Sequence, residues 1–156
     1  MEQPIVSGIA LDKNQARVSL ADVRDRPGIA AEIFGVLASG NINVDMIVQT
    51  IGRDGKTDID FTIPQTDVEQ TKQILAPFAS DVESIDYDCN IAKVSIVGVG
   101  MKSHSGVASV AFKALANENI NIMMISTSEI KVSMIIESKH AEIAVRALHN
   151  AYELDK

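Results

Sequence analysis

Apolar and polar residues alternate over two separate segments of the chain, and a helical repeat of apolar positions follows each of them. Residues 15–23 alternate as a half-buried strand does, and residues 91–99 do so with more apolar positions. Beyond a short polar turn, apolar side chains recur at helical spacing over residues 30–37 and again over residues 107–115. The pattern therefore predicts a strand followed by a helix in each half of the chain.

The first half continues with three more predicted strands and a second helix. Residues 43–51 and 57–63 have the composition of strands, and Gly52-Arg53-Asp54-Gly55 between them is typical of a hairpin turn. A helical pattern follows over residues 67–78, and a strand pattern over residues 81–89. The resulting order is βαββαβ, in which the helices cover one face of an antiparallel sheet. We therefore expect an α+β fold built from ferredoxin-like units.

Three residues are expected to mark helix ends. Pro27 suits the first turn of a helix, where its missing N–H has no cost. Gly40 is expected to end the first helix as a C-cap. Thr66 is the candidate N-cap of the helix predicted at residues 67–78.

The second half of the chain repeats the first. Residues 27–47 match residues 105–125 without gaps, and roughly half of the positions are identical. Past a loop that is shorter in the second copy, residues 58–62 are matched to residues 129–133. A repeat of this length predicts two copies of one fold.

The second copy is incomplete, whereas one strand is left over at the N-terminus. After a helix predicted at residues 139–150, only six residues remain, which are too few for a fourth strand. Residues 4–11 read as a strand that precedes the first copy. Because an open sheet edge needs a partner, we expect this strand to complete the second copy's sheet. The predicted domains are residues 15–89, and residues 1–14 together with 90–156, so that the first unit is inserted in the second.

Charge and cysteine content exclude several classes of function. The net charge of −7 argues against nucleic acid as a partner, because phosphate binding needs clustered Lys and Arg. Cys89 is the only cysteine, which excludes an internal disulfide and argues against a cysteine-based zinc site. No segment has the apolar length of a membrane span or the pattern of a signal peptide, so we expect a cytoplasmic protein without membrane contact.

The sequence contains no convincing catalytic motif. Ser103-His104-Ser105 resembles a nucleophile beside a base, but it is at the position of Asp25-Arg26-Pro27 in the other copy, which favours a loop. Gly98-Val99-Gly100 lacks the third glycine of a dinucleotide fingerprint. We expect no catalytic residue, no metal and no cofactor in this chain.

Both copies share a strand, a short polar loop and a helix with a glycine, Gly28 or Gly106, in its first turn. Backbone N–H groups and the helix dipole at such a start favour a bound carboxylate. Asp25 on the loop and Asp58 on the third strand could hold an ammonium group, and Gln49 is a polar residue in an otherwise apolar strand. These residues together suit a free amino acid.

A purely structural interpretation of the same residues stays open. Gly28 and Gly106 could shape a tight turn, and Asn43 and Asn121 could cap the backbone between helix and strand. The pattern alone does not choose between ligand binding and these structural roles.

Two groups of motifs carry a resemblance to known proteins. Asp25-x-Pro27-Gly28, followed by a helix and Asn41-Ile42-Asn43, resembles the ACT domain, a small-molecule sensor of amino-acid metabolism. Five further segments resemble the regulatory region of the aspartokinase family: residues 6–14, 97–107, 119–122, 125–130 and 146–149.

The resemblance implies a function without catalysis in this chain. In the aspartokinase family a kinase domain uses ATP and Mg²⁺ to phosphorylate aspartate, and threonine and/or lysine act as feedback inhibitors of this first step of lysine, threonine and methionine biosynthesis. The kinase motif is missing here, which implies a regulatory β subunit with a catalytic α subunit as partner, or a fragment of a longer enzyme. Family members bind effectors between the first unit of one chain and the second unit of another, so a homodimer is implied.

The resemblance also implies two effector sites of unequal quality. The first would combine residues of one chain with a corner of the other: Asp25, Gly28, Ile29, Ala30, Gln49 and Asp58, with Asn121 and Ile122. The second would use the equivalent positions: Ser103, His104, Gly106 and Val107, with Asn43 and Val44. Since position 103 is Ser where the first site has Asp25, we expect the second pocket to be weaker, lysine-specific or empty.

Two alternative functions stay open. One is another tandem-ACT sensor, either a stand-alone regulator or the valine-responsive small subunit of acetolactate synthase. The other is an enzyme on the same fold, such as an acylphosphatase, which would need an arginine in a phosphate loop. Arg26 is the only candidate, and it lacks a glycine-rich context.

Overall fold

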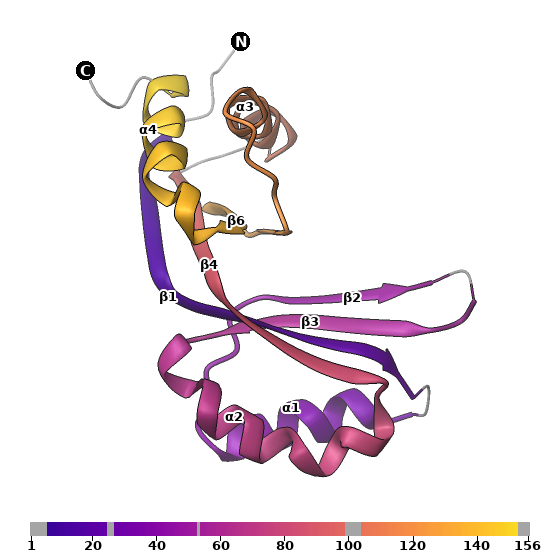
Figure 1. Ribbon diagram of the computed structural model, residues 1–156. Helices are drawn as coiled ribbons and strands as arrows, with labels where there is room; N and C mark the ends of the chain where they lie inside the picture. The colour runs from indigo at the N-terminus through magenta and orange to yellow at the C-terminus, as the bar shows by residue number, and fades with distance from the viewer. Residues whose placement is uncertain (1–5, 25–26, 53, 99–103, 153–156) are drawn as a thin grey trace. The chain divides into compact units, whose positions relative to one another are not determined.

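The computed structural model describes residues 6–24, 27–52, 54–98 and 104–152, and these form two compact units (Figure 1). The first unit comprises residues 14–89. The second unit comprises the described parts of residues 1–13 and 90–156. Asp25, Arg26 and Ser103, which were candidates from the sequence, lie outside the described residues.

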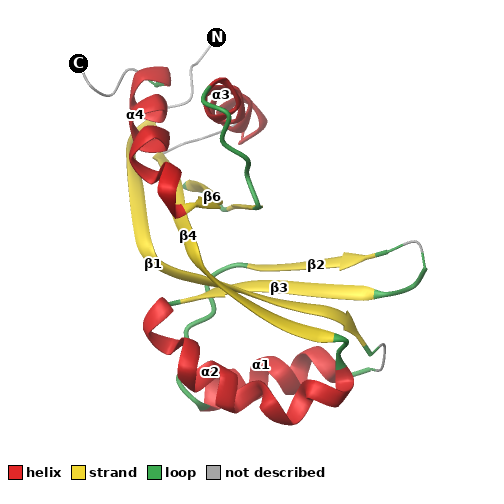
Figure 2. Ribbon diagram, in the orientation of Figure 1, coloured by secondary structure: helices red, strands yellow, loops and turns green. Residues whose placement is uncertain are grey.

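In the first unit two helices cover one face of a four-stranded sheet (Figure 2). The strand order is β2-β3-β1-β4, with both β1 and β2 antiparallel to β3. Its elements are the C-terminal part of β1 (Val6–Val23), α1 (Ile29–Ser39), β2 (Ile47–Ile51), β3 (Thr57–Ile63), α2 (Val68–Leu75) and the N-terminal part of β4 (Ser84–Gly98).

The second unit repeats this arrangement with strand order β1-β4-β6-β5. It uses the N-terminal part of β1 and the C-terminal part of β4, together with α3 (His104–Asn117), β5 (Met124–Thr127), β6 (Lys131–Glu137) and α4 (Ala141–Ala151). Short 3₁₀ turns precede α2 and α4 at Gln65–Asp67 and Ser138–His140, and another follows α2 at Ala76–Asp81. No described helix has the length and hydropathy needed to cross a membrane.

Two long strands replace four that the sequence separated. The predicted strands at 4–11 and 15–23 are one strand, β1, and those at 81–89 and 91–99 are one strand, β4. The residues between them contain no Pro or Gly, so nothing in the backbone ends the extended conformation there. Val6 and Ile9, near the start of β1, pack against the core of the second unit, so the first unit is inserted in the second.

Each unit has its own apolar core between the sheet and its helices. In the first unit the core includes Phe61, whose ring meets that of Phe34 edge to face at 5.4 Å between centroids. The largest fully buried side chains of this core are Leu20, Ile33, Leu37, Phe61, Ile63 and Leu75. In the second unit the fully buried core side chains include Ile96, Leu115, Met134, Ile136 and Leu148.

The strand register shows which residues of the two units are equivalent. Leu20 is opposite Ile59 in the first unit, and Ile96 is opposite Val132 in the second. The gapless repeat matches Ile47 with Ile125, which lie opposite Phe61 and Met134. Val132 is therefore the counterpart of Ile59, and Lys131 the counterpart of Asp58. The match of residues 58–62 to 129–133 was therefore wrong by two positions. It aligned similar residue types but put Ile59, which is in the core, opposite Ile130, which is 48% exposed.

The helix ends differ in part from the prediction. Asn41 and Asn119, the first residues of the two Asn-Ile-Asn motifs, have left-handed backbones with φ of 61° and 57°. Gly40 is the C-cap residue, but its φ is −86°, and a side chain there would place Cβ 2.5 Å from Cδ1 of Ile74. A side chain at Gly40 would therefore require the Ile74 side chain to move, and Asn41 supplies the left-handed turn. Thr66 is not the N-cap of α2, because the helix begins after Asp67.

We expect Phe61→Ala to lower the free energy of unfolding by about 3–5 kcal/mol, because the substitution leaves a cavity beneath α1. Ile143→Ala on α4 is the matched control, since the Ile143 side chain is 45% exposed, and it should change stability by about 0.5 kcal/mol or less. Equilibrium unfolding in urea measures both values. Equal effects of the two substitutions would contradict the assignment of Phe61 to the core.

Candidate ligand-binding site

The start of α1 is open and shaped by Gly28. Gly28 is exposed and has a left-handed backbone with φ of 90°, and its carbonyl accepts the N–H of Glu32 at 3.0 Å. A side chain at Gly28 would have no heavy atom within 4 Å, so the glycine is required by the backbone conformation and not by space. Gly28 is the N-cap residue of α1 and has no side chain with which to cap the helix. Because the first N–H groups of a helix have no partner within it, they remain available to an anionic group.

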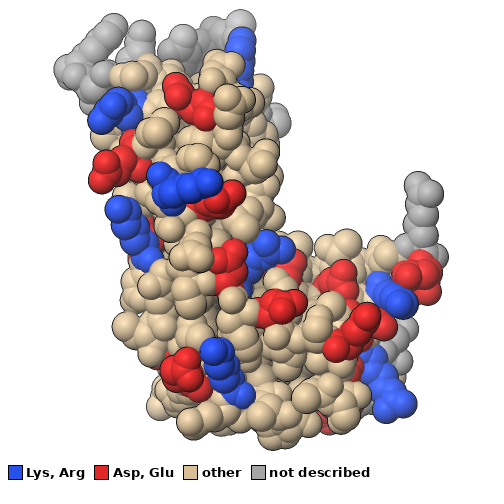
Figure 3. All heavy atoms as spheres, viewed as in Figure 1, with Lys and Arg blue, Asp and Glu red and all other residues tan. Residues whose placement is uncertain are grey.

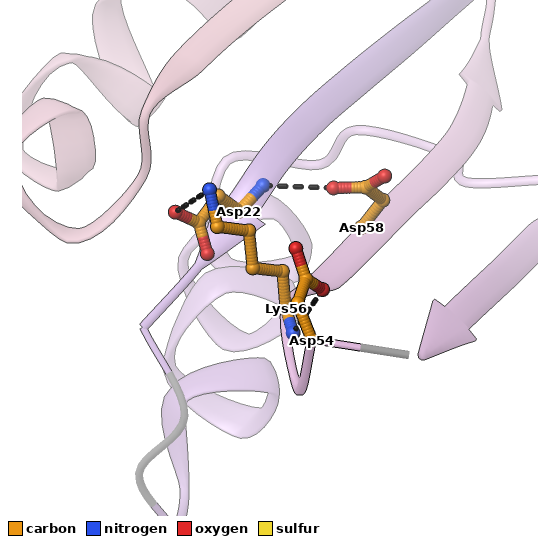
Figure 4. A network of polar contacts seen from close by, with 4 residues as sticks. All are labelled: Asp22, Asp54, Lys56 and Asp58. Atoms are coloured by element: carbon orange, nitrogen blue, oxygen red, sulfur yellow. Dashed lines mark hydrogen bonds and ion pairs between the residues drawn. The ribbon is translucent and has the colours of Figure 1, made fainter. Parts of the chain in front are cut away.

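The end of β1 carries a bulge beside this helix start. Between Leu20 and Val23 the register with β3 shifts, and Asp22 has a left-handed backbone with φ of 50°. The backbone N–H of Asp22 donates a hydrogen bond to Oδ1 of Asp58 at 2.8 Å (Figure 4). The carboxylate of Asp22 is 3.8 Å from Nζ of Lys56. The backbone N–H of Lys56 donates a hydrogen bond to the carboxylate of Asp54. Asp58 thus supports the backbone as well as carrying a charge.

Gln49 lies on the edge strand β2 with its side chain exposed. It is opposite Ile59, and therefore on the face of the sheet that the helices cover. Its neighbours on that face, Ile47 and Ile51, are 55% and 72% exposed, because they extend past the covered part of the sheet. The polar candidate is therefore flanked by two exposed apolar side chains.

The topology brings the first set of candidates to one end of the first unit. Strands β1 and β2 are both antiparallel to β3, so their C-terminal ends lie at the same edge as the start of β3 and the start of α1 (Figure 1). The residues exposed at this end include Gly28, Ala30, Gln49 and Asp58. Ile29, by contrast, is 7% exposed and belongs to the core. Ile29 therefore offers a ligand its backbone more than its side chain.

Asn43 and Asn121 do not have the capping role that the sequence left open. Both side chains are exposed, and in the described part of the chain neither has a hydrogen-bond partner. The backbone turn is made two residues earlier, at Asn41 and Asn119. The residue after each of these asparagines packs against the core of its own unit. Val44, a candidate for the second pocket, packs in the first unit, and Ile122, a candidate for the first pocket, packs in the second unit.

The start of α3 in the second unit is built differently. Gly106 is exposed and Val107 is buried, and the carbonyl of Val107 accepts a hydrogen bond from the hydroxyl of Tyr152, just beyond α4. Burial raises the pKa of Tyr152 to about 12. This is the net result, since a backbone hydrogen bond at Ala111 acts in the opposite direction and partly offsets the effect of burial. The side chain of His104 and all of Ser103 lie outside the described residues.

The two candidate pockets also differ in charge. Lys131 occupies the register position of Asp58, and Thr127 occupies that of Gln49. The second unit therefore has an ammonium where the first has a carboxylate. The sequence comparison missed this difference because it aligned Asp58 with Glu129. A shift of two positions keeps the alternation of core and surface residues, so the strand register was needed to detect it.

The described residues show neither a basic patch on the face drawn in Figure 3 nor a metal-binding cluster. Acidic and basic side chains are interspersed over the face drawn in Figure 3, which differs from the Lys and Arg clustering that phosphate binding requires. Among the described residues there is no group of three His, Cys, Asp or Glu side chains suited to a metal ion.

Two family models match the chain. Models of the ACT domain match residues 17–80 and residues 94–152, so the protein is of the tandem ACT-domain class. The chain is 76% identical to an aspartokinase of Helicobacter pylori over all of its 156 residues, which span 38% of that relative. It therefore belongs to the aspartokinase family, as the resemblance implied, and corresponds to the regulatory region.

Solved structures support the same assignment. The crystal structure of aspartokinase alpha and beta subunits aligns with a TM-score of 0.88 and 51% identity, covering 95% of this chain and 99% of that one. The ligand-free regulatory subunit of aspartate kinase from Thermus thermophilus aligns with a TM-score of 0.89 and 39% identity, with the same coverage.

We expect Gly28→Ala to lower the free energy of unfolding by about 1–2 kcal/mol, because alanine is strained at positive φ. Gly35→Ala is the matched control in the same helix, where a Cβ also meets nothing within 4 Å but the backbone is helical. It should raise stability by about 0.5–1 kcal/mol. Urea unfolding of both variants checks the sign. A neutral or stabilising Gly28→Ala would show that the left-handed turn is not needed.

Proposed function

We propose that this chain is the amino-acid-sensing part of an aspartate kinase, and that threonine and/or lysine bind to its first unit as feedback inhibitors. The enzyme would phosphorylate aspartate in the cytoplasm, at the first step of lysine, threonine and methionine biosynthesis. The observation that carries the proposal is the open, glycine-shaped start of α1 beside the polar ends of β1 and β2, in a chain of the aspartokinase family.

A free amino acid suits this end of the first unit. The N–H groups at the start of α1 would hold its carboxylate, and Gln49 and Asp25 would face its ammonium group or side chain. Hydrogen bonds to charged groups contribute about 1.5–3 kcal/mol each, so a few of them suffice for micromolar binding. The similarity to aspartokinases favours threonine and lysine over valine, the effector of the alternative sensor.

We propose that a second copy of this chain completes the site. The edge strand β2 exposes Ile47 and Ile51, and β5 of the second unit exposes Ile125, which is 45% accessible. Unpaired edge strands with apolar side chains favour association. In the homodimer the first unit of one copy would lie beside the second unit of the other, which would contribute Asn121 and Ile122.

The second pocket is proposed not to bind an amino acid in the same manner. Ser103, His104, Gly106 and Val107, with Asn43 and Val44 of the other copy, would line it, but Lys131 replaces the carboxylate of Asp58. Position 103 is also Ser where the first site has Asp25, so the second pocket lacks a carboxylate for the ammonium group of an amino acid. One occupied site per pair of units is therefore expected.

Inhibition requires a kinase domain, and the proposed partner is a catalytic α subunit, or a kinase domain in the same chain. ATP and Mg²⁺ would bind there and not in this chain. Effector binding would favour one arrangement of the regulatory units and with it a less active kinase. Such coupling is typically about 1–3 kcal/mol and is reciprocal between effector and substrate.

Calorimetric titration with threonine and with lysine tests the proposal directly, with valine as the control ligand. We expect Gln49→Ala to weaken binding about tenfold or more, because one polar contact is lost. Thr127→Ala, at the same register position of the second unit, should leave the affinity unchanged. If neither threonine nor lysine releases heat with the intact dimer, the proposed function is wrong.

Ile51→Lys should convert the dimer to monomer, because it places a charge on the exposed edge strand. Analytical ultracentrifugation over a concentration series measures this change. Ile143→Lys, on the exposed face of α4, is the control and should leave the dimer intact. A monomeric wild-type chain at micromolar concentration would contradict the assembly.

A further inference from the structure

We propose that Asp58 is a positioning residue: its carboxylate holds the end of β1, and thereby the helix start that receives the effector, without contacting the effector's ammonium group. The inference rests on the proposed function and changes the role that the sequence suggested for Asp58. It assigns the specificity of the site to residues other than Asp58.

The bulge at the end of β1 creates the need for such a residue. Leu20 pairs with Ile59 and Val23 with Thr57, so two residues of β1 lie opposite Asp58 alone. Asp22, the second of these, has φ of 50°, a conformation that residues with side chains rarely adopt. The extra residue cannot use the regular ladder, and its N–H is bound by the Asp58 side chain at 2.8 Å instead.

Hydrogen bonds hold the end of β1 from both sides. On the β3 side, the Asp58 carboxylate accepts a hydrogen bond from the backbone N–H of Asp22. The carboxylate of Asp22 itself lies 3.8 Å from Nζ of Lys56. On the other side, Glu83 donates its N–H to the carbonyl of Ala21, and Arg24 donates to that of Asp81, both at 2.8 Å. Gly28 follows only six positions after Asp22, so the bulge limits how far from it α1 can begin.

In this arrangement the acceptor for the Asp22 N–H is a side chain, that of Asp58. Figure 4 shows the Asp58 carboxylate directed at this N–H. Hydrogen bonds to an ionised acceptor are about twice as strong as neutral ones. Asp58 is next to Ile59, the residue opposite Gln49, so its side chain leaves β3 on the other face of the sheet from Gln49.

Among the described residues of the second unit, no side chain plays the part of Asp58. Lys131 occupies the position of Asp58, and the N–H of Gly98 at the end of β4 is bound by the carbonyl of Ile130 at 2.9 Å. This end of β4 is thus held by a backbone hydrogen bond. In the part of the chain that the structure describes, the side-chain support occurs in the unit in which effector binding is proposed.

Two substitutions separate positioning from direct contact. Asp58→Asn keeps an oxygen that can accept the Asp22 N–H but removes the charge, whereas Asp58→Ala removes both. Calorimetry of the full chain with threonine and with lysine should show affinity about tenfold weaker or more for Asp58→Ala, and within about threefold of wild type for Asp58→Asn. Lys131→Ala is the control and should bind as wild type does.

A direct ammonium contact predicts a different result, in which Asp58→Asn loses as much affinity as Asp58→Ala. That result would overturn the inference. Should Asp58→Ala fail to fold, Asp22→Gly combined with Asp58→Ala removes the strain at φ of 50° while the hydrogen bond is still missing, and its affinity should also fall.

Residue-resolved amide exchange without any ligand distinguishes failure of this inference from failure of the proposed function. Exchange at Asp22 and Glu32 should accelerate in Asp58→Ala and return toward wild type in Asp58→Asn. Unchanged exchange in Asp58→Ala overturns the positioning role even if the chain binds threonine or lysine. Wild-type protein that binds neither amino acid overturns the proposed function, and with it the role of Asp58 in effector binding.

Discussion

Both units depend on backbone hydrogen bonding along the same two strands, β1 and β4, which are neighbours in the sheet order. Each unit takes one part of each strand, so neither has a complete sheet without them. Without the first residues of β1 the second unit would expose a row of unsatisfied N–H and carbonyl groups at a sheet edge. The insertion of the first unit follows from this requirement.

The order of helices and strands could be predicted from the sequence because it follows from local periodicity. Alternation over residues 15–23 and 91–99 and the helical repeats after them are properties of neighbouring residues. The continuity of β1 and β4 could not be predicted in the same way. Residues 12–14 and Asn90 have weak preferences for strand conformation, and pairing with other strands decides their conformation.

Part of the candidate site could not be predicted from the sequence either. The hydrogen bond between Asp22 and Asp58 joins residues 36 positions apart and exists only because of a register shift. Gly28, by contrast, was recognisable from its place in the repeat, and the structure shows the positive φ that requires a glycine. The equivalence of Asp58 with Lys131 needed the strand register, since residue types alone favoured Glu129.

The shared strands also set the order in which the two units can form during synthesis. The first unit is contained in residues 14–89, so all of its elements exist before the second half of the chain has been made. The second unit combines the earliest strand with α4 and with Tyr152, whose hydroxyl binds the carbonyl of Val107. Since domains generally fold as they emerge from the ribosome, residues 6–13 must wait unpaired while the inserted unit folds. Of the two units, the outer one contains the strand that precedes the inserted unit in the sequence, yet it is completed after the inserted unit.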